Sequence, residues 1–252
     1  MIDYLILLAA AVIGGATNAL AGGGTFLTFP ALLLVGIAPV QANATASLVL
    51  LPGAFASAWV YRDTIRKTQG SFLGWMTAAS LVGSVIGSVL LLSTSDATFS
   101  KLVPWLLLVA SVVFTAAPWL RSIETSRHGR QSLTWLIVGQ VAISAYGGYF
   151  GAGMGVLMIA LYLIATKLDV YAATGLRMVC SCAINTLAVA IFAFRGAIVY
   201  RVGLPMLVAG IIGGYLGAIA VRRLDPKHAR LAILTYAWAL TAWFFLKPLF
   251  SF

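Results

Sequence analysis

Eight long apolar stretches, separated by short polar ones, make up most of the 252-residue chain. Each is close to the ~20 apolar residues that an α-helix needs to cross a hydrocarbon core ~30 Å thick. This pattern predicts an all-α integral membrane protein, folded as a polytopic helical bundle. The stretches are roughly Tyr4 to Leu20, Val40 to Tyr61, Ser71 to Leu92, Leu102 to Leu120, Leu133 to Phe150, Val170 to Phe194, Leu204 to Val221 and Leu231 to Leu246.

Two shorter apolar runs, Thr25 to Val35 and Val156 to Thr166, contain only 11 residues each. At a rise of ~1.5 Å per residue, each would form a helix of ~17 Å, about half the depth of a membrane. Glycines come directly before both runs, at Gly22 to Gly24 and at Gly151 to Gly155. We therefore expect two glycine-broken short helices. Each short helix and the helix before it either cross the membrane twice, once each, or form a re-entrant hairpin, and the sequence leaves both arrangements open.

The same order of features occurs twice along the chain. Five matched pairs of residues recur at separations of 129 to 131 positions, namely Gly24/Gly155, Thr45/Thr174, Gly83/Gly213, Gly87/Gly217 and Asp96/Asp225. Agreement among markers from separate stretches indicates a duplicated unit. We predict an N-terminal transmembrane repeat at residues 1–120, a polar linker at 121–131 and a C-terminal transmembrane repeat at 132–252.

The distribution of lysine and arginine predicts that the two repeats are inverted relative to one another. In an inverted arrangement, eleven of these residues share one side of the membrane and four lie on the other, whereas a parallel arrangement gives nearer nine and six. Basic residues accumulate on the cytoplasmic side, so inversion is favoured and both chain ends are expected outside the cytoplasm. The shared side contains Arg62, Arg66, Lys67, Arg121, Arg127, Arg130, Lys167, Arg222, Arg223, Lys227 and Arg230.

Composition excludes a water-soluble protein. Apolar types make up 62% of the chain and charged types only 9%, against roughly a quarter charged in an ordinary globular domain. The net charge of +10 does not indicate nucleic-acid binding, because the basic residues lie in short clusters between apolar runs, where they act as topology signals. The surface is therefore expected to face a lipid bilayer.

The glycine breaks are the first candidate site. Broken backbone at membrane depth survives only when it is buried in protein or lines a wet cavity, since hydrocarbon offers no hydrogen bonds. The first amides of a helix are unpaired and its N-terminus is positive, which suits a small anion. We predict that main-chain groups cradle such an anion, although glycines that only permit tight packing are the alternative. The predicted main-chain residues are Gly22, Gly23, Gly24, Thr25, Gly153 and Gly155.

Polar side chains near the breaks are the second set of candidates. Arg177 lies about seven residues into its apolar segment, ~10 Å deep at helical rise. An arginine at this depth indicates a partner, a water path or an anion, or else a side chain that extends to the headgroups. Asn185, deeper in the same segment, is expected to hydrogen-bond between helices. The residues predicted to orient the anion beside Arg177 are Asn18, Asn43, Thr45 and Thr174.

Several kinds of chemistry are missing from the apolar segments. No Asp or Glu lies inside any of the long ones, which disfavours a cation pump. His128 and His228 lie in polar loops, and no catalytic constellation or metal-ligand spacing is found at membrane depth. The sequence therefore predicts no enzyme, no catalytic residue, no metal and no cofactor. A membrane-embedded enzyme and a non-transporting accessory protein remain as weaker alternatives.

The stretch Ala16 to Pro30, ATNALAGGGTFLTFP, resembles the sulfite exporter TauE/SafE family of bacterial membrane permeases. The segments Ala42 to Thr45 and Ala173 to Arg177 carry the same resemblance, whereas Met154 departs from it, because it stands where the first unit has Gly23. The resemblance implies a multi-pass permease of the bacterial inner membrane. Its substrate would be a small anion, most simply a sulfur oxyanion or organosulfonate such as sulfite or sulfoacetate, with another small organic anion as the alternative. Rocking of one repeat against the other would alternate access, and a homo-oligomer is left open.

Overall fold

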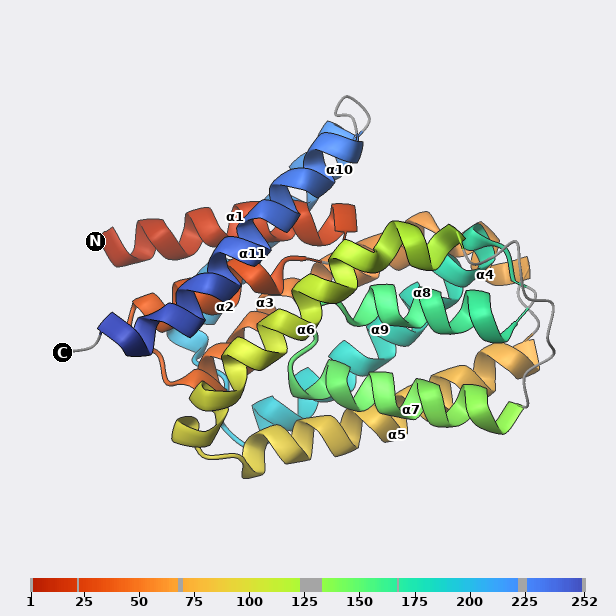
Figure 1. The fold of residues 1–252 in the computed structure, drawn as a ribbon, viewed down its shortest axis with the longest axis horizontal. Helices are drawn as coiled ribbons and strands as arrows, with labels where there is room; N and C mark the ends of the chain where they lie inside the picture. Colours follow the sequence, from red (N-terminus) through yellow and green to blue (C-terminus); the bar gives the residue numbers. More distant parts are fainter. Residues whose placement is uncertain are drawn as a thin grey trace.

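Helices account for nearly all of the chain that the computed structural model describes, which covers residues 2–21, 23–67, 70–122, 133–166, 168–221 and 226–250. Within these ranges the secondary structure consists of eleven α-helices without a strand (Figure 1). In chain order they are α1 (Ile2–Ala21), α2 (Thr25–Leu34), α3 (Pro39–Val60), α4 (Arg62–Lys67), α5 (Gly70–Ser93), α6 (Asp96–Ser122), α7 (Leu133–Tyr149), α8 (Met154–Ala165), α9 (Val170–Phe194), α10 (Tyr200–Val221) and α11 (Pro226–Phe250).

Each of the eight long apolar stretches forms a helix, and each short run forms a separate one, so the all-helical prediction is confirmed. Among the described residues, three helices are long and apolar enough to cross a membrane: Gly70–Ser93, Asp96–Ala116 and Tyr171–Phe194. On α5, apolar side chains such as Val82, Val85 and Ile86 are exposed. Such a surface is stable when lipid rather than water surrounds it.

The two broken helices form hairpins with one short arm. The chain breaks between α1 and α2 and again between α7 and α8, and each short helix turns back toward the end of the molecule where the preceding helix begins (Figure 1). With 10 and 12 residues, α2 and α8 are about 15 and 18 Å long. Because the hydrocarbon core is ~30 Å thick, neither can cross it alone. Of the two arrangements left open above, this geometry favours the re-entrant hairpin.

The long helices pack in two groups, and each group includes one helix from the other half of the chain. Helix α10 packs along α1 and α3, while α5 packs along α7 and α9. In the contacts of α1 with α10 and of α5 with α7, the helix backbones come close together because glycines lie at the interface. A Cβ atom on Gly213 of α10 would overlap the carbonyl oxygen of Val12, and one on Gly87 of α5 would overlap that of Ala145. We call α1, α2, α3 and α10 the first bundle, and α5, α7, α8 and α9 the second bundle.

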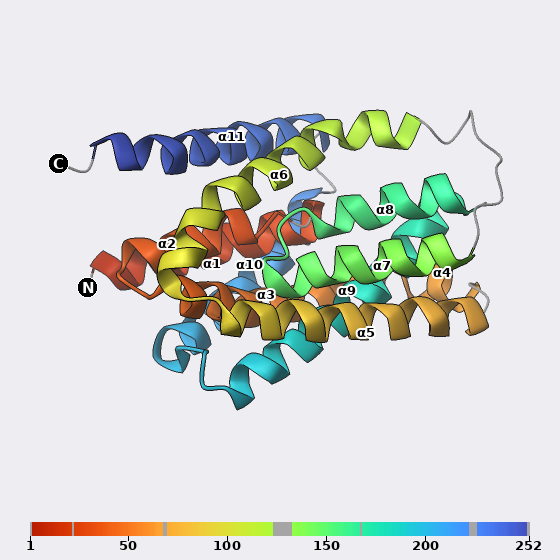
Figure 2. The ribbon, with the colours of Figure 1, turned by 60° about the horizontal axis from the view of Figure 1, so that its bottom comes forward.

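Each bundle has its own buried core. In the second, apolar side chains from α5, α7, α8 and α9 pack around Tyr162 and Met158. The other core lies mainly in the first bundle and extends to α6 and to the last turns of α9. Helices α6 and α11 pack against each other, and Figure 2 shows them along one side of the molecule. Ser111 and Thr241 hydrogen-bond between these two helices, with 3.0 Å between their hydroxyl oxygens.

Helix α4 distinguishes one end of the molecule from the other. Helices α1 and α11 place the two chain ends at one end, and α4 lies at the opposite end (Figure 1). The sequence pattern did not predict α4, whose Arg62 and Arg66 are exposed. The Arg62 guanidinium lies 5.2 Å from the ring centre of Trp59, a contact typical of the headgroup level. Most of the predicted linker lies outside the described residues, so the boundary between the repeats stays a prediction.

Candidate functional site

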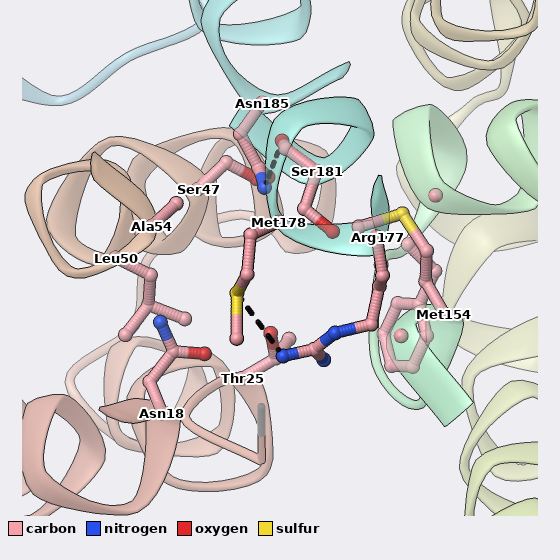
Figure 3. Close-up of a pocket in the computed structure, with 14 residues that line it drawn as sticks. Asn18, Thr25, Ser47, Leu50, Ala54, Met154, Arg177, Met178, Ser181 and Asn185 are labelled. Carbon is pink, nitrogen blue, oxygen red and sulfur yellow. Dashed lines mark hydrogen bonds between the residues drawn. The ribbon is translucent and has the colours of Figure 1, made fainter. Parts of the chain in front are cut away.

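A polar cavity lies between the two bundles, where the broken helices meet α3 and α9 (Figure 3). Its volume is about 70 Å³. One water needs ~10–15 Å³ of such space, so the cavity has room for roughly five waters or a small polyatomic ion. Its polar side chains are Asn18, Thr25, Ser47, Arg177, Ser181 and Asn185. Its apolar side chains are Leu50, Ala54, Phe150, Met154 and Met178.

Arg177 supplies the charge of this cavity. It extends from α9 into the space that Asn18 and Thr25 also face (Figure 3). Its Nη2 atom donates to the sulfur of Met178 at 3.2 Å, and its Nε atom is buried. The guanidinium therefore lies at the cavity wall. Among the described residues, no Asp or Glu lines the cavity, so the site has a net positive charge.

The first turn of α8 lies directly beside this guanidinium. A Cβ atom on Gly155 would overlap Nη1 of Arg177 and would lie 3.1 Å from its Cδ and Cζ atoms. The helix begins at Met154, after Gly153 in a left-handed conformation with φ of 77°. The positive end of the α8 dipole therefore meets the positive charge of Arg177 at one wall of the cavity.

Most amides in the first turns of the two short helices are already bonded. In the first break, the amides of Phe26, Leu27 and Thr28 donate to Gly23 or Gly24. In the second, the amides of Met154, Val156 and Leu157 donate to Gly151 or Gly153. Thr25 and Gly155 line the cavity, and their amides donate to no acceptor among the described residues. Of the six residues predicted to bind an anion through the main chain, Thr25 and Gly155 therefore remain as candidates.

Gly151 of the second break also lines the cavity, whereas Gly23, Gly24 and Gly153 do not. Gly24 is buried, and a Cβ atom there would lie 2.6 Å from both the Gly14 oxygen and Cδ2 of Leu50. Gly153 faces Ala110 of α6, and Gly23 is buried. Gly22 lies outside the described residues. At Gly24 the glycine permits close packing of α1, α2 and α3, as the alternative interpretation proposed.

Three of the predicted polar residues also lie outside the wall. Asn43 is 1% exposed, and its Nδ2 atom donates to the carbonyl of Tyr149 at 3.0 Å. The Thr45 hydroxyl accepts from the amide of Val199 at 3.0 Å. Thr174 lies on α9 three residues before Arg177, but does not line the cavity.

Three further polar residues line the cavity that were not among the predicted binding residues, namely Ser47, Ser181 and Asn185. The Nδ2 atom of Asn185 donates to the carbonyl of Ser181 at 2.8 Å, within its own helix, so the expected bond between helices is not the one formed. A sequence signal did exist, because positions four and eight residues after Arg177 share its helix face. Among the described residues, no group of three or more His, Cys, Asp or Glu is placed to hold a metal.

A multi-pass helical protein with a polar cavity between broken helices has the architecture of a secondary transporter. Comparison with known proteins agrees. Residues 7–244 match the family described as sulfite exporter TauE/SafE, and the chain belongs to that family. The resemblance inferred from the residues is thereby confirmed.

Curated relatives cover most of the chain. A probable membrane transporter protein of Haemophilus influenzae is 29% identical over 96% of this chain and 94% of its own length. The probable membrane transporter protein ORF9 of Sinorhizobium is 27% identical over 84% of this chain and 80% of its own length. The probable membrane transporter protein YfcA of Escherichia coli K12 is 24% identical over 94% of this chain and 87% of its own length. The chain is thus a multi-pass protein of a membrane transporter family.

Proposed function

We propose that this protein is a secondary transporter that carries a small anion across the bacterial inner membrane. The substrate class that fits best is a sulfur oxyanion or organosulfonate, such as sulfite or sulfoacetate. The observation that supports this proposal is the contact between Arg177 and Gly155 at the cavity wall. No enzymatic step is part of the proposal.

Electrostatics favour an anion at this place. An arginine inside a membrane protein is costly and needs a compensating partner. The N-terminus of α8 adds a second positive field, equivalent to roughly half an elementary charge, next to the guanidinium. Two positive groups side by side repel each other, and an anion in the cavity beside them stabilises both. The Thr25 hydroxyl and the Asn18 amide, which also line the cavity, can donate further hydrogen bonds to its oxygens.

The pairing of the helices supports two repeats related by a two-fold axis. With repeats at 1–120 and 132–252, α1 corresponds to α7 and α5 to α10. The contacts α1 with α10 and α5 with α7 are then equivalent, since each joins one repeat's first helix to the other repeat's helix. The contacts of α3 with α10 and of α9 with α5 are equivalent in the same way. A two-fold axis in the membrane plane relates inverted repeats in this manner.

The same pairing changes how alternating access would work. Rocking of one repeat against the other would separate α1 from α10 and α5 from α7, which are closely packed through Gly213 and Gly87. The moving units are therefore the first and second bundles, each of which combines helices of both repeats. Their contact between α3 and α9, which contribute Ser47 and Arg177 to the cavity, is the surface that would open.

A short organic tail also has a place in the cavity. Leu50, Ala54, Met154 and Met178 form an apolar part of the wall next to the polar part. This arrangement suits an anion with a small aliphatic group, such as sulfoacetate, and it equally supports another small organic anion as the second candidate.

Transport in proteoliposomes tests the proposal. Radiolabelled sulfite uptake is measured for the purified protein and for Arg177→Ala, which should abolish it, and for Arg177→Lys, which should retain part of it. Arg201→Ala removes an exposed arginine of α10 and should leave uptake unchanged. Sulfite and sulfoacetate should also raise the melting temperature above the value in equal chloride. Undiminished uptake by Arg177→Ala would contradict the proposal.

A further inference from the structure

Asn43 satisfies a main-chain group that the second helix break exposes. Tyr149 is the last residue of α7, so its carbonyl has no partner in the helix. At membrane depth such a group needs another partner. The Nδ2 atom of Asn43, on α3, donates to this oxygen at 3.0 Å, and the side chain is 1% exposed. The bond joins the first bundle to the second.

The orientation of the Asn43 amide follows from this bond. A carbonyl oxygen only accepts hydrogen bonds, so the NH₂ group has to face Tyr149, and a flipped amide would bring two acceptors together. The Oδ1 atom is buried and has no hydrogen-bond partner among the described residues. A buried acceptor left in this way is destabilising. The bond to Tyr149 is therefore the reason that the structure gives for an asparagine here.

The residues on both sides of this bond reach the cavity. Phe150 and Gly151 follow Tyr149 directly, and both line the cavity. Ser47 is one helical turn after Asn43, donates to the Asn43 carbonyl at 3.0 Å, and lines the opposite part of the wall. Asn43 itself does not line the cavity. Its side chain thus connects two walls of the site without touching the space between them.

We propose that Asn43 is a positioning residue for anion transport. By holding the Tyr149 carbonyl, it fixes the segment that leads from α7 into α8, and so keeps Gly155 beside Arg177. This inference rests on the proposed function, and it assigns Asn43 a role through the main chain in place of direct contact with the substrate.

The test compares the concentration dependence of sulfite uptake in proteoliposomes. Asn43→Ala should raise the KM for sulfite about fivefold, the change that corresponds to loss of one ordinary hydrogen bond, and should change Vmax less. Asn43→Leu keeps nearly the size of the side chain but has no donor and adds no charge, and should raise KM similarly. If Asn43→Ala does not fold, Asn43→Leu decides the question by the same criterion.

Ser111→Ala is the matched control. Ser111 is as buried as Asn43, and its replacement removes one side-chain hydrogen bond, to Thr241, between α6 and α11. The Ser111→Ala variant should have a lower melting temperature and an unchanged KM. Equal KM values for wild type and the Asn43 variants would overturn the inference, as would an equal rise in KM for Ser111→Ala. Failure of the wild type itself to transport or be stabilised by sulfite would instead contradict the proposed function.

A second readout follows the wall itself. Met154→Cys, in a background with Cys180 and Cys182 replaced by alanine, places a thiol at the start of α8 in the cavity wall. Sulfoacetate, whose sulfonate does not react with thiol reagents as sulfite does, should slow its reaction with a hydrophilic thiol reagent, and Asn43→Leu should remove most of that protection at the same sulfoacetate concentration. Unchanged protection would overturn the positioning role, because a merely structural loss of stability does not alter occupancy at a well-positioned site.

Discussion

The Arg177 side chain and the main chain of Gly155 are in such close contact that a Cβ atom on residue 155 would overlap the guanidinium. Both residues belong to the second bundle, so the contact brings an intramembrane charge and the start of a helix into one rigid unit. Neither residue alone makes an anion site, because a lone arginine can find other partners and a lone helix N-terminus is common. Their juxtaposition in one cavity wall makes the site suited to an anion.

Gly155→Ala should reduce sulfite transport strongly without unfolding the protein. The new Cβ displaces the Arg177 guanidinium, whereas alanine in place of glycine in a helix is itself favourable by up to ~1 kcal/mol. Initial rates in proteoliposomes and melting temperatures in detergent measure the two effects. Gly74→Ala is the control, since a Cβ atom there meets nothing within 4 Å. Normal transport by Gly155→Ala would contradict the importance of this contact.

Gly213→Ala and Gly87→Ala should destabilise the fold. Each adds a methyl group where two helices touch through their main chains, at Val12 and Ala145 respectively, so the helices have to move apart. Overpacking of this kind costs ~1–3 kcal/mol. Thermal unfolding in detergent should show a lower melting temperature for both variants, whereas the melting temperature of Gly74→Ala should not be lowered. Melting temperatures equal to that of the control would mean that these interfaces are looser than described.

The sequence predicted the helices well because the bilayer selects for long apolar segments. The predicted stretch Ser71 to Leu92 and helix α5 differ by one residue at each end. The sequence pattern did not predict α4, which is six residues long, polar and too short for a periodic pattern. The pattern also did not identify which helices pair. The glycine pattern indicated close approach, but nothing in a single sequence shows that Gly213 meets Val12.

The candidate site was predicted less completely, for a geometric reason. Proximity in sequence to a glycine break selected residues, but rotation of each helix about its axis decides which side chains face the cavity. Asn43 and Thr45 point to other helices from α3, whereas Ser47 on the same helix lines the cavity. The predicted residues that line the cavity are Asn18, Thr25, Gly155 and Arg177. Their role in binding stays a prediction.

Gln140→Leu should destabilise the second bundle in a way that Tyr162→Phe partly relieves. Gln140 is fully buried, accepts from the Tyr162 hydroxyl at 2.8 Å and donates to Ser80 at 2.7 Å. Leucine at 140 leaves the tyrosine hydroxyl without this acceptor inside the membrane. Side-chain bonds between membrane helices average ~0.6 kcal/mol, with a maximum of ~1.7 kcal/mol.

A double-mutant cycle on unfolding free energy measures that coupling. The double variant should be less destabilised than the sum of the two single variants by an amount in this range. Ser111→Ala combined with Tyr162→Phe is the control, because the two residues lie in different parts of the protein and should be additive. Strict additivity of Gln140→Leu and Tyr162→Phe would show that the network contributes no pairwise stability.

The end of the molecule that carries α4 should face the cytoplasm. Arg62 and Arg66 are exposed there, and the chain ends and the turn between α5 and α6 lie at the other end (Figure 1). Basic residues accumulate inside, so Arg66→Cys should react with an impermeant thiol reagent only after the membrane is opened. Ser95→Cys, exposed in the α5 to α6 turn, should react in intact cells. Both variants are made in a background with Cys180 and Cys182 replaced by alanine. The opposite labelling pattern would invert the orientation, and reaction of both positions in intact cells would mean that the chain inserts in two orientations, which the predicted excess of basic residues on one side disfavours.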